Sequence, residues 1–177
     1  MSTISIQYYN CSFGELIIGS FNNQLCICDW RYRKMRQSID NRICKGLNAE
    51  YREEPSLIIN QTIEQIEAYT NGELTEFTIP LLMVGTTFQK KVWNALLNIP
   101  HGQTRSYLEL SKELGDVKAI RAVASANGAN AISIIVPCHR VIGSDGKLVG
   151  YAGGLSAKTK LLELEGYKKE CDQLKLF

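Results

Sequence analysis

A cysteine, a histidine and an arginine stand side by side at Cys138, His139 and Arg140, and the chain has one other histidine. Nearby positive charge favours the thiolate form of cysteine, which is the nucleophile, so the triplet is a candidate for a reactive thiol with a lowered pKa. Neighbours on an extended strand point in opposite directions. Taken alone, the triplet therefore favours a buried, inert cysteine, and the assignment depends on its surroundings.

The other cysteines are interpreted as reduced thiols, because the sequence has no secretory signal and is long enough to bury a core without disulfides. Cys26 and Cys28 lie two residues apart on a predicted strand, and their spacing is not that of a zinc knuckle. A buried structural role is favoured over a zinc site there. We expect neither a metal nor a cofactor. The five remaining cysteines are Cys11, Cys26, Cys28, Cys44 and Cys171.

The composition is that of a soluble globular protein, with 177 residues of which 45% are hydrophobic and 21% charged. The N-terminus lacks a basic segment typical of a signal peptide, and no apolar run approaches the roughly 18 residues that span a bilayer. We therefore expect a cytoplasmic protein without a membrane partner. Residues 1–84 carry a net charge of −3 and residues 85–177 one of +5. A modestly basic second half suits a phosphate-contacting surface.

The first half of the sequence has a β-like pattern followed by one helix. Short apolar or alternating runs at residues 4–8, 16–19 and 25–30 are separated by turn residues, which predicts a small antiparallel sheet. Apolar residues at helical spacing predict a helix over residues 57–70, with Asn71 and Gly72 at its C-terminal end. We expect an α/β domain over residues 1–80 and a junction at residues 81–87.

The second half, residues 88–177, is expected to be mostly helical. Thr87 and Ser106 are predicted to cap two helices, and a third runs from Lys118 to about Asn127. The last two, joined by a tight link at Gly115, have the outline of a helix-turn-helix, although a plain helical hairpin fits the pattern as well. Residues 132–136 are predicted to be a buried strand that leads to Cys138, and residues 156–166 a final amphipathic helix.

Several further segments, in order along the chain, resemble the O6-alkylguanine-DNA alkyltransferase family, also called methylated-DNA–protein-cysteine methyltransferases. The resemblance covers about residues 86–167 and is looser over residues 1–80. It implies a ribonuclease-H-like N-terminal domain and a winged-helix-like C-terminal domain. The segments are Phe88-Gln89-Lys90-Lys91-Val92-Trp93, Ile99-Pro100-His101-Gly102-Gln103-Thr104, Ser106-Tyr107, Arg121-Ala122-Val123, Asn127-Gly128-Ala129-Asn130, Pro137-Cys138-His139-Arg140-Val141-Ile142, Gly150-Tyr151-Ala152-Gly153-Gly154 and Leu162-Glu163-Leu164-Glu165-Gly166.

The resemblance implies DNA repair in which an alkyl group on O6 of guanine, or on O4 of thymine, moves permanently to Cys138. His139 is then the base that acts on Cys138 through a water molecule, and Glu165 orients His139. Asn130 braces the turn that holds the thiol, and Tyr107 donates a proton to the departing base. A thioether does not hydrolyse, so each molecule is expected to react once.

The resemblance also implies binding of double-stranded DNA through the minor groove, with little sequence preference and strong salt dependence. The target base must leave the duplex, and Arg121 is expected to fill the gap. The predicted DNA contacts are Arg121, Ala122, Ser125, Ala126, Asn127 and Arg140, and the predicted base pocket comprises Val141, Tyr151, Ala152 and Gly153.

Two residues depart from the commoner pattern of the family. Ala131 stands where many members have a proline after the asparagine, which removes a rigid φ from the turn. Ala152 stands where some members have a serine, so a backbone N–H would have to contact the alkylated oxygen.

Two other functions compete with repair. A sensor of alkylated DNA would lack the reactive cysteine, which this chain has. A cysteine hydrolase would need an oxyanion hole, which the sequence does not signal. A monomer is the simplest expectation for the assembly state.

Overall fold

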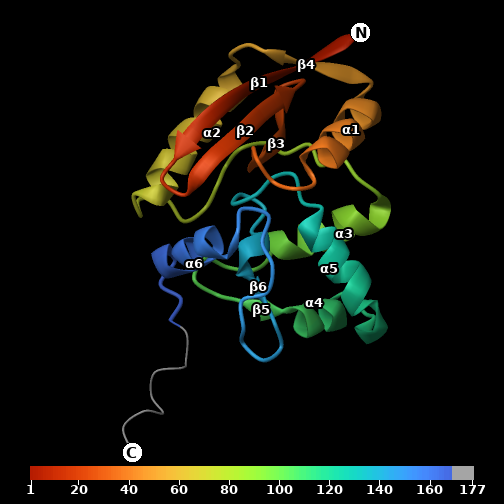
Figure 1. The fold of residues 1–177 in the computed structure, drawn as a ribbon, viewed down its shortest axis with the longest axis vertical. Helices are drawn as coiled ribbons and strands as arrows, with labels where there is room; N and C mark the ends of the chain where they lie inside the picture. The colour runs from red at the N-terminus through yellow and green to blue at the C-terminus, as the bar shows by residue number, and fades with distance from the viewer. Residues whose placement is uncertain (169–177) are drawn as a thin grey trace, which may run out of the picture.

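The computed structural model describes residues 1–168, in which a four-stranded sheet with two helices lies above a mainly helical part (Figure 1). Within this described part of the chain, no helix has both the length and the apolar character needed to cross a bilayer. The strands are β1 (Ser2–Cys11), β2 (Gly14–Phe21), β3 (Gln24–Trp30), β4 (Ala49–Glu53), β5 (Arg105–Ser106) and β6 (Val141–Ile142). The α-helices are α1 (Arg36–Leu47), α2 (Leu57–Thr70), α3 (Thr87–Leu97), α4 (Tyr107–Glu113), α5 (Ile120–Gly128) and α6 (Leu155–Leu164). Two short 3-10 helices are η1 (Val117–Ala119) and η2 (Cys138–Arg140).

The large sheet is mixed, which corrects the prediction of an antiparallel one. Its strand order is β3-β2-β1-β4, with β4 parallel to β1 and the other pairs antiparallel. The sequence analysis missed β4 and α1 because their apolar signal is weak. In α1 only Ile39 and Ile43 are buried, and in β4 only Ala49 is.

The predicted helix at residues 57–70 is confirmed as α2, which packs against β1, β2 and β3. The Ser56 hydroxyl accepts a hydrogen bond from the Ile59 N–H at its start, and Asn71 caps its end. Gly72 follows with a φ of 76°, a left-handed conformation that favours glycine. The inner face of α2 buries Ile59, Ile66 and Tyr69.

The predicted helices of the second half are present with small shifts of their ends. Thr86, rather than Thr87, caps α3, and Ser106 caps α4; both form capping boxes with the residue three positions on. The predicted helix from Lys118 to Asn127 is divided into η1 and α5. The α4 and α5 helices pack against each other, so the pair has the outline of the predicted helix-turn-helix.

Residues 130–137 do not form the predicted strand. They form buried turns in which Ile134 has a φ of 72°, and only Ile132 makes a bridge, to Cys28 of β3. The Cys28 N–H donates to the Ala131 carbonyl at 2.9 Å, and the Ser133 N–H donates to the Cys28 carbonyl at 2.7 Å. An apolar run alone does not distinguish an extended strand from a buried turn. These bonds fasten the chain before Cys138 to the edge of the sheet.

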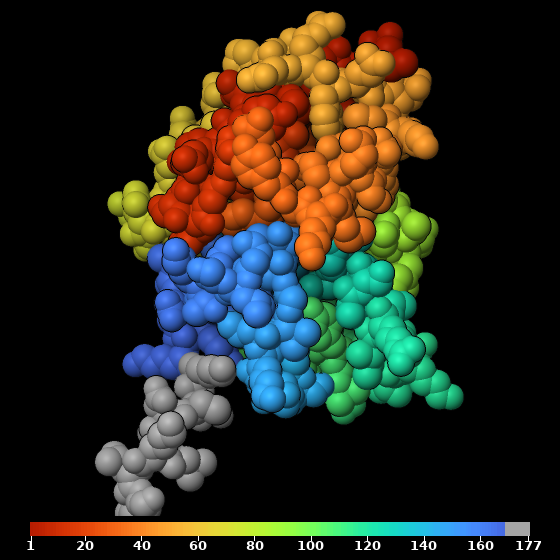
Figure 2. All heavy atoms as spheres, in the orientation of Figure 1, coloured from red at the N-terminus to blue at the C-terminus, as the bar shows by residue number. Residues whose placement is uncertain are grey.

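One hydrophobic cluster contains side chains from both halves of the molecule. Leu16 and Trp30 of the sheet share it with Val123, Val136 and Leu161 of the second half. Figure 2 shows the two parts meeting along a continuous boundary on the visible face. The segment that contains Val136 and Cys138 is therefore held by packing against side chains from both parts.

Candidate active site

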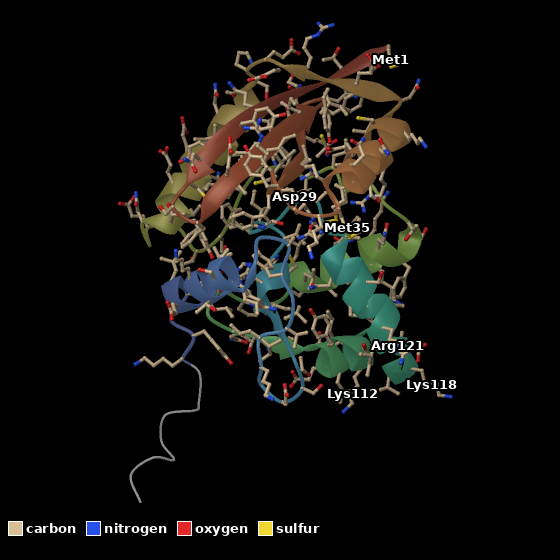
Figure 3. The ribbon with its side chains drawn as sticks, viewed as in Figure 1. Met1, Asp29, Met35, Lys112, Lys118 and Arg121 are labelled. Atoms are coloured by element: carbon tan, nitrogen blue, oxygen red, sulfur yellow. The ribbon has the colours of Figure 1, made fainter. Side chains whose placement is uncertain are left out.

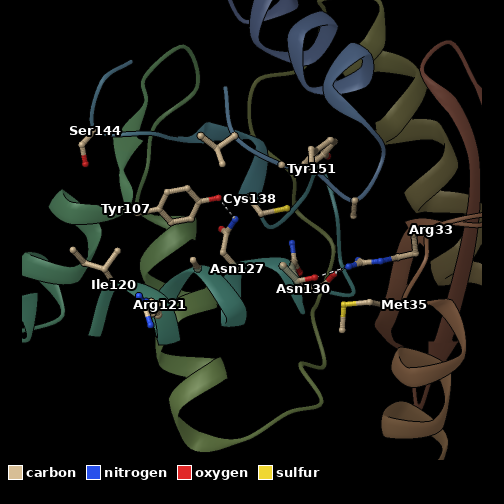
Figure 4. A pocket seen from close by; sticks show the side chains of 15 residues that line it. Arg33, Met35, Tyr107, Ile120, Arg121, Asn127, Asn130, Cys138, Ser144 and Tyr151 are labelled. Atoms are coloured by element: carbon tan, nitrogen blue, oxygen red, sulfur yellow. Dashed lines mark hydrogen bonds between the residues drawn. The ribbon is translucent and has the colours of Figure 1, made fainter. Parts of the chain in front are cut away.

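The Cys138 sulfur points into a pocket between α5 and the segment at residues 149–152 (Figure 4). The pocket has a volume of about 500 Å³, and Cys138 is 4% exposed at its floor. This size lies in the ordinary range for small-molecule sites. Tyr107 lies on one side of the thiol and Tyr151 on the other. The site can therefore admit a planar group and bring it against the sulfur.

Two of the four predicted base-pocket residues, Tyr151 and Ala152, line this pocket. Val141 does not, because its side chain is fully buried in the core. Gly153 packs against Trp30 so closely that a Cβ atom there would lie 2.5 Å from the ring. Val141 and Gly153 pack behind the pocket wall in this structure, and their predicted contact with a bound base stays a prediction.

Burial raises the pKa of the Cys138 thiol above its usual range. A hydrogen bond with Asn130 and the charges of Arg33 and Lys158 favour the thiolate but do not overcome burial. The neighbouring charges thus do not lower the pKa of the thiol in the resting site, as the triplet alone had left open. The thiol keeps its proton until a base removes it, so a reactive Cys138 needs an adjacent base.

Behind Cys138, the buried carboxylate of Glu165 collects hydrogen bonds from four groups. Its Oε1 accepts from His139 Nε2 at 2.9 Å, Tyr69 Oη at 2.7 Å and Arg140 Nη2 at 2.9 Å. Its Oε2 accepts from Arg140 Nε at 2.9 Å and from the Gly102 N–H at 3.4 Å. Burial alone would raise the pKa of Glu165, but the bonds from His139, Arg140 and Tyr69 hold it well below the usual value. Glu165 is therefore a carboxylate that can only accept.

The tautomer of His139 follows from this partner. Because Glu165 accepts, the proton of the neutral ring lies on Nε2. The other ring nitrogen, Nδ1, is buried and has no hydrogen-bond partner. Burial lowers the pKa of His139, against the opposing effect of Glu165, so the ring is neutral near pH 7. The unprotonated Nδ1 has the protonation state that a general base requires, and a water molecule would have to connect it to the thiol.

Asn130 closes the turn before the thiol with its side-chain amide. Its Nδ2 donates to the Val136 carbonyl at 2.9 Å, and its Oδ1 accepts from the Ile132 N–H at 2.9 Å. These are the contacts that the predicted bracing role needs. The side chain is 2% exposed, so the bonds do not compete with water.

Tyr107 begins α4, directly after the capping residue Ser106. Its hydroxyl accepts a hydrogen bond of 3.5 Å from Asn127 Nδ2 and faces the pocket beside the thiol (Figure 4). Burial, and the charge of a Cys138 thiolate, raise the pKa of Tyr107. The phenol is therefore protonated and able to donate to a group bound in the pocket.

Three of the six predicted DNA contacts, Arg121, Ala122 and Ser125, lie exposed on α5. The other three face inward, which corrects the prediction. Ala126 is packed in the core beneath Trp93, and Asn127 turns toward Tyr107. Arg140 is held by Glu165 and donates to the Ile99 carbonyl. The three inward residues support the site from beneath, and none presents its side chain at the surface.

The sequence analysis missed three buried charged residues, which are Lys158, Asp29 and Arg33, the partner of Asp29. Lys158 of α6 is fully buried, and its Nζ donates to the carbonyls of Val141, Val149 and Gly150 at 2.6, 3.1 and 3.4 Å. Burial lowers the pKa of Lys158 to about 8. These bonds join the segment after Cys138 to the pocket wall. In the sequence, Lys158 has no feature that distinguishes it from a surface lysine.

The second missed group is Asp29, at the end of an otherwise apolar strand. It accepts hydrogen bonds from Arg33, Arg36 and the Ser133 hydroxyl. Arg33 also donates to the carbonyls of Gly128 and Asn130, at 2.5 and 3.1 Å. A charged residue in the apolar run Leu25–Trp30 was a usable signal, because a buried carboxylate requires a partner.

Among residues 1–168, no group of three or more histidine, cysteine, aspartate or glutamate side chains is arranged to hold a metal ion. The five cysteines in this range are free thiols. Cys171 lies outside the described residues.

Comparison with known proteins identifies the family. Residues 87–167 match a family model described as "6-O-methylguanine DNA methyltransferase, DNA binding domain". The methylated-DNA–protein-cysteine methyltransferase of Mycobacterium leprae is 56% identical over 108 residues, which span 61% of this chain and 66% of the relative, slightly under two thirds. That of Methanosarcina acetivorans is 60% identical over 102 residues, 58% of this chain and 65% of the relative.

The likeness to a solved structure extends over nearly the whole chain. The Mycobacterium tuberculosis OGT protein, solved in complex with DNA, superposes with a TM-score of 0.79 at 40% identity, and the match covers 92% of this chain and 93% of that one. The protein described here therefore belongs to the methylated-DNA–protein-cysteine methyltransferase family.

Proposed function

We propose that this protein repairs DNA by direct reversal, moving the alkyl group of O6-alkylguanine, and of O4-alkylthymine, irreversibly onto Cys138. The observation that carries the proposal is the position of one sulfur. Cys138 opens into a pocket of about 500 Å³ beside an exposed helix, with the His139–Glu165 pair buried behind it. A protein that only sensed damage would have no use for a nucleophile in that position.

The transfer is an in-line displacement at the alkyl carbon. His139 Nδ1 takes the thiol proton through a water molecule, and the sulfur attacks the carbon as the carbon–oxygen bond breaks. The electron pair of that bond stays on guanine, which takes a proton from the Tyr107 hydroxyl. The sulfur ends as a thioether, and no group in the pocket could cleave it. Each molecule therefore acts once.

The exposed residues of α5 form the proposed DNA contact. Arg121 lies on the surface and also lines the pocket, so it can fill the stack when the target base turns inward. Ala122 and Ser125 are small and allow the helix to approach a narrow minor groove. Contacts of this kind read little sequence and depend strongly on salt.

Finer assignments belong to the same proposal. We assign residues 1–80 to a ribonuclease-H-like domain and residues 88–177 to a winged-helix-like one, joined by residues 81–87. We also assign the protein to the cytoplasm. A monomer is sufficient for the reaction, because repair needs one thiol and one DNA site.

The test follows a label from DNA to protein. Duplex DNA carrying O6-[³H-methyl]guanine is supplied in excess over the protein, and the label on protein is counted. Wild type should take up one label per molecule, and Cys138→Ser none. Cys11→Ser, a half-buried thiol away from the pocket, should behave as wild type. Label that stays on the DNA would identify a sensor, and repeated turnover would identify a hydrolase.

A further inference from the structure

The loop between β3 and α1, residues 31–35, brings the sheet domain to the pocket. Arg33 and Met35 line the same pocket as Cys138 and Arg121, although they are about a hundred residues away in sequence. Figure 4 shows Met35 and Arg121 at opposite ends of this pocket. The loop is thus a second rim, across the site from the first turn of α5.

The loop is fixed to the C-terminal end of α5 by its one buried cation. Arg33 is 9% exposed, pairs with Asp29 and donates to the carbonyls of Gly128 and Asn130. Its contacts with carbonyls at the end of a helix are electrostatically favourable as well. The loop therefore keeps its position relative to the exposed face of α5.

The exposed face of α5 runs directly to this loop. Arg121, Ser125 and Gly128 are exposed at the spacing of one helical face, which ends where Arg33 is bonded. Figure 3 labels Met35 and Arg121 near the two ends of the helix. A helix of this length spans roughly 13 Å, more than the approximately 6 Å width of a minor groove. In a complex where α5 lies across the groove, its two ends would therefore lie near the phosphates that border the groove.

A cation lies at each of these ends. Lys118 is exposed in η1, directly before α5, and Lys34 is exposed in the β3–α1 loop, which is bonded to the C-terminal end of α5 through Arg33. Arg31, Arg33 and Arg36 of the loop region are paired with Glu15, Asp29 and Asp40. Within residues 1–168, this leaves Lys34 as the cation of the loop without a salt bridge. Beside it, Tyr32 and Met35 are 77% and 47% exposed.

We propose that the β3–α1 loop is a DNA contact of the N-terminal domain, with Lys34 on a backbone phosphate and Met35 packed against the adjoining sugar. The inference rests on the proposed function, since it takes duplex DNA as the partner of α5. It gives the sheet domain a part in substrate binding beyond packing. Duplex DNA is the partner favoured here because this loop borders the pocket and is bonded to the end of α5, the helix that is proposed to bind DNA.

The first experiment measures binding of unmodified duplex DNA at several salt concentrations. Lys34→Gln should lower the slope of log K against log salt by about 0.9, the loss of one phosphate contact. Lys45→Gln, an exposed lysine at the far end of α1, should keep the wild-type slope. Equal slopes for Lys34→Gln and wild type would overturn the inference.

The second experiment tests the apolar part of the loop. Met35→Glu places a negative charge against the proposed backbone and should weaken binding on the order of tenfold. Leu57→Glu, at an exposed leucine on the start of α2, should not change it. Wild-type affinity of Met35→Glu would also overturn the inference. Label transfer to Cys138 of the wild-type protein distinguishes a failure of the proposed function from a failure of the loop inference. If wild type takes up no label, the proposed function is refuted, whatever the loop variants do.

Discussion

Glu165 and Asp29 are both buried carboxylates that accept hydrogen bonds from arginine, but they contact different groups near the turns that lead to Cys138. Glu165 contacts the ring of His139, next to Cys138 in the chain. Asp29 contacts Ser133 and, through Arg33, the backbone at Asn130. The first cluster fixes which nitrogen carries a proton, and the second fixes where the chain runs. We therefore expect Glu165 to serve the proposed chemistry and Asp29 to serve the structure that supports it.

The largest effect should come from the Glu165 side. In Glu165→Gln the partner of His139 is neutral and can present an N–H to the ring, so the tautomer with a free Nδ1 is no longer enforced. We expect the single-turnover rate of methyl transfer from duplex DNA to fall by roughly 10²–10⁴, the usual contribution of a general base. Rapid quench with labelled DNA measures this rate.

The control for this change is Glu163→Gln, an exposed glutamate on the same helix, which should keep the wild-type rate. Glu165→Gln leaves the buried Arg140 without a counter-charge and could unfold the protein. Circular dichroism therefore checks that the variant is folded. A folded Glu165→Gln protein with the wild-type rate would remove the distinction between the two carboxylates.

The Asp29 side should affect stability instead. Asp29→Asn leaves the buried Arg33 without a counter-charge, which typically costs about 3–5 kcal/mol. We expect a loss of this order in the free energy of unfolding, measured with urea, and less than a tenfold change in the transfer rate of the folded protein. Asp145→Asn, at an exposed pair with Lys147, should change stability by under about 0.5 kcal/mol. A rate loss as large as that of Glu165→Gln would contradict the separation.

The same comparison explains what could be predicted from sequence. Periodic apolar residues located α2, α3 and α4, and the predicted cap Ser106 does begin α4, because such signals act locally. The turns at residues 130–137 could not be predicted, since Asn130 and β3 shape them through bonds between distant segments.

The site shows the same limit. The family resemblance pointed to Cys138, His139 and Glu165, and in the structure Glu165 is bonded to His139, the residue that follows Cys138. It gave no reason to expect Arg140 inside or Lys158 as a buried cation. Those placements depend on which carbonyls and carboxylates the fold leaves without partners, and that is a property of the folded chain.

The smallest effect, and the sharpest test of the Glu165 cluster, is the pH dependence of transfer. Burial lowers the pKa of His139 below its usual 6.5, against the raising effect of Glu165. The base is lost only when the ring gains a proton, so the rate should fall by at most about tenfold per pH unit on an acid limb whose midpoint lies below pH 6.5. Removing Glu165 removes the raising effect, so the acid limb of Glu165→Gln should lie at lower pH than that of wild type. Asp29→Asn should leave the limb unchanged, since Asp29 makes no contact with the ring. If the acid limb moved in Asp29→Asn and not in Glu165→Gln, the pKa of His139 would be set by Asp29 and not by Glu165, which would contradict the comparison.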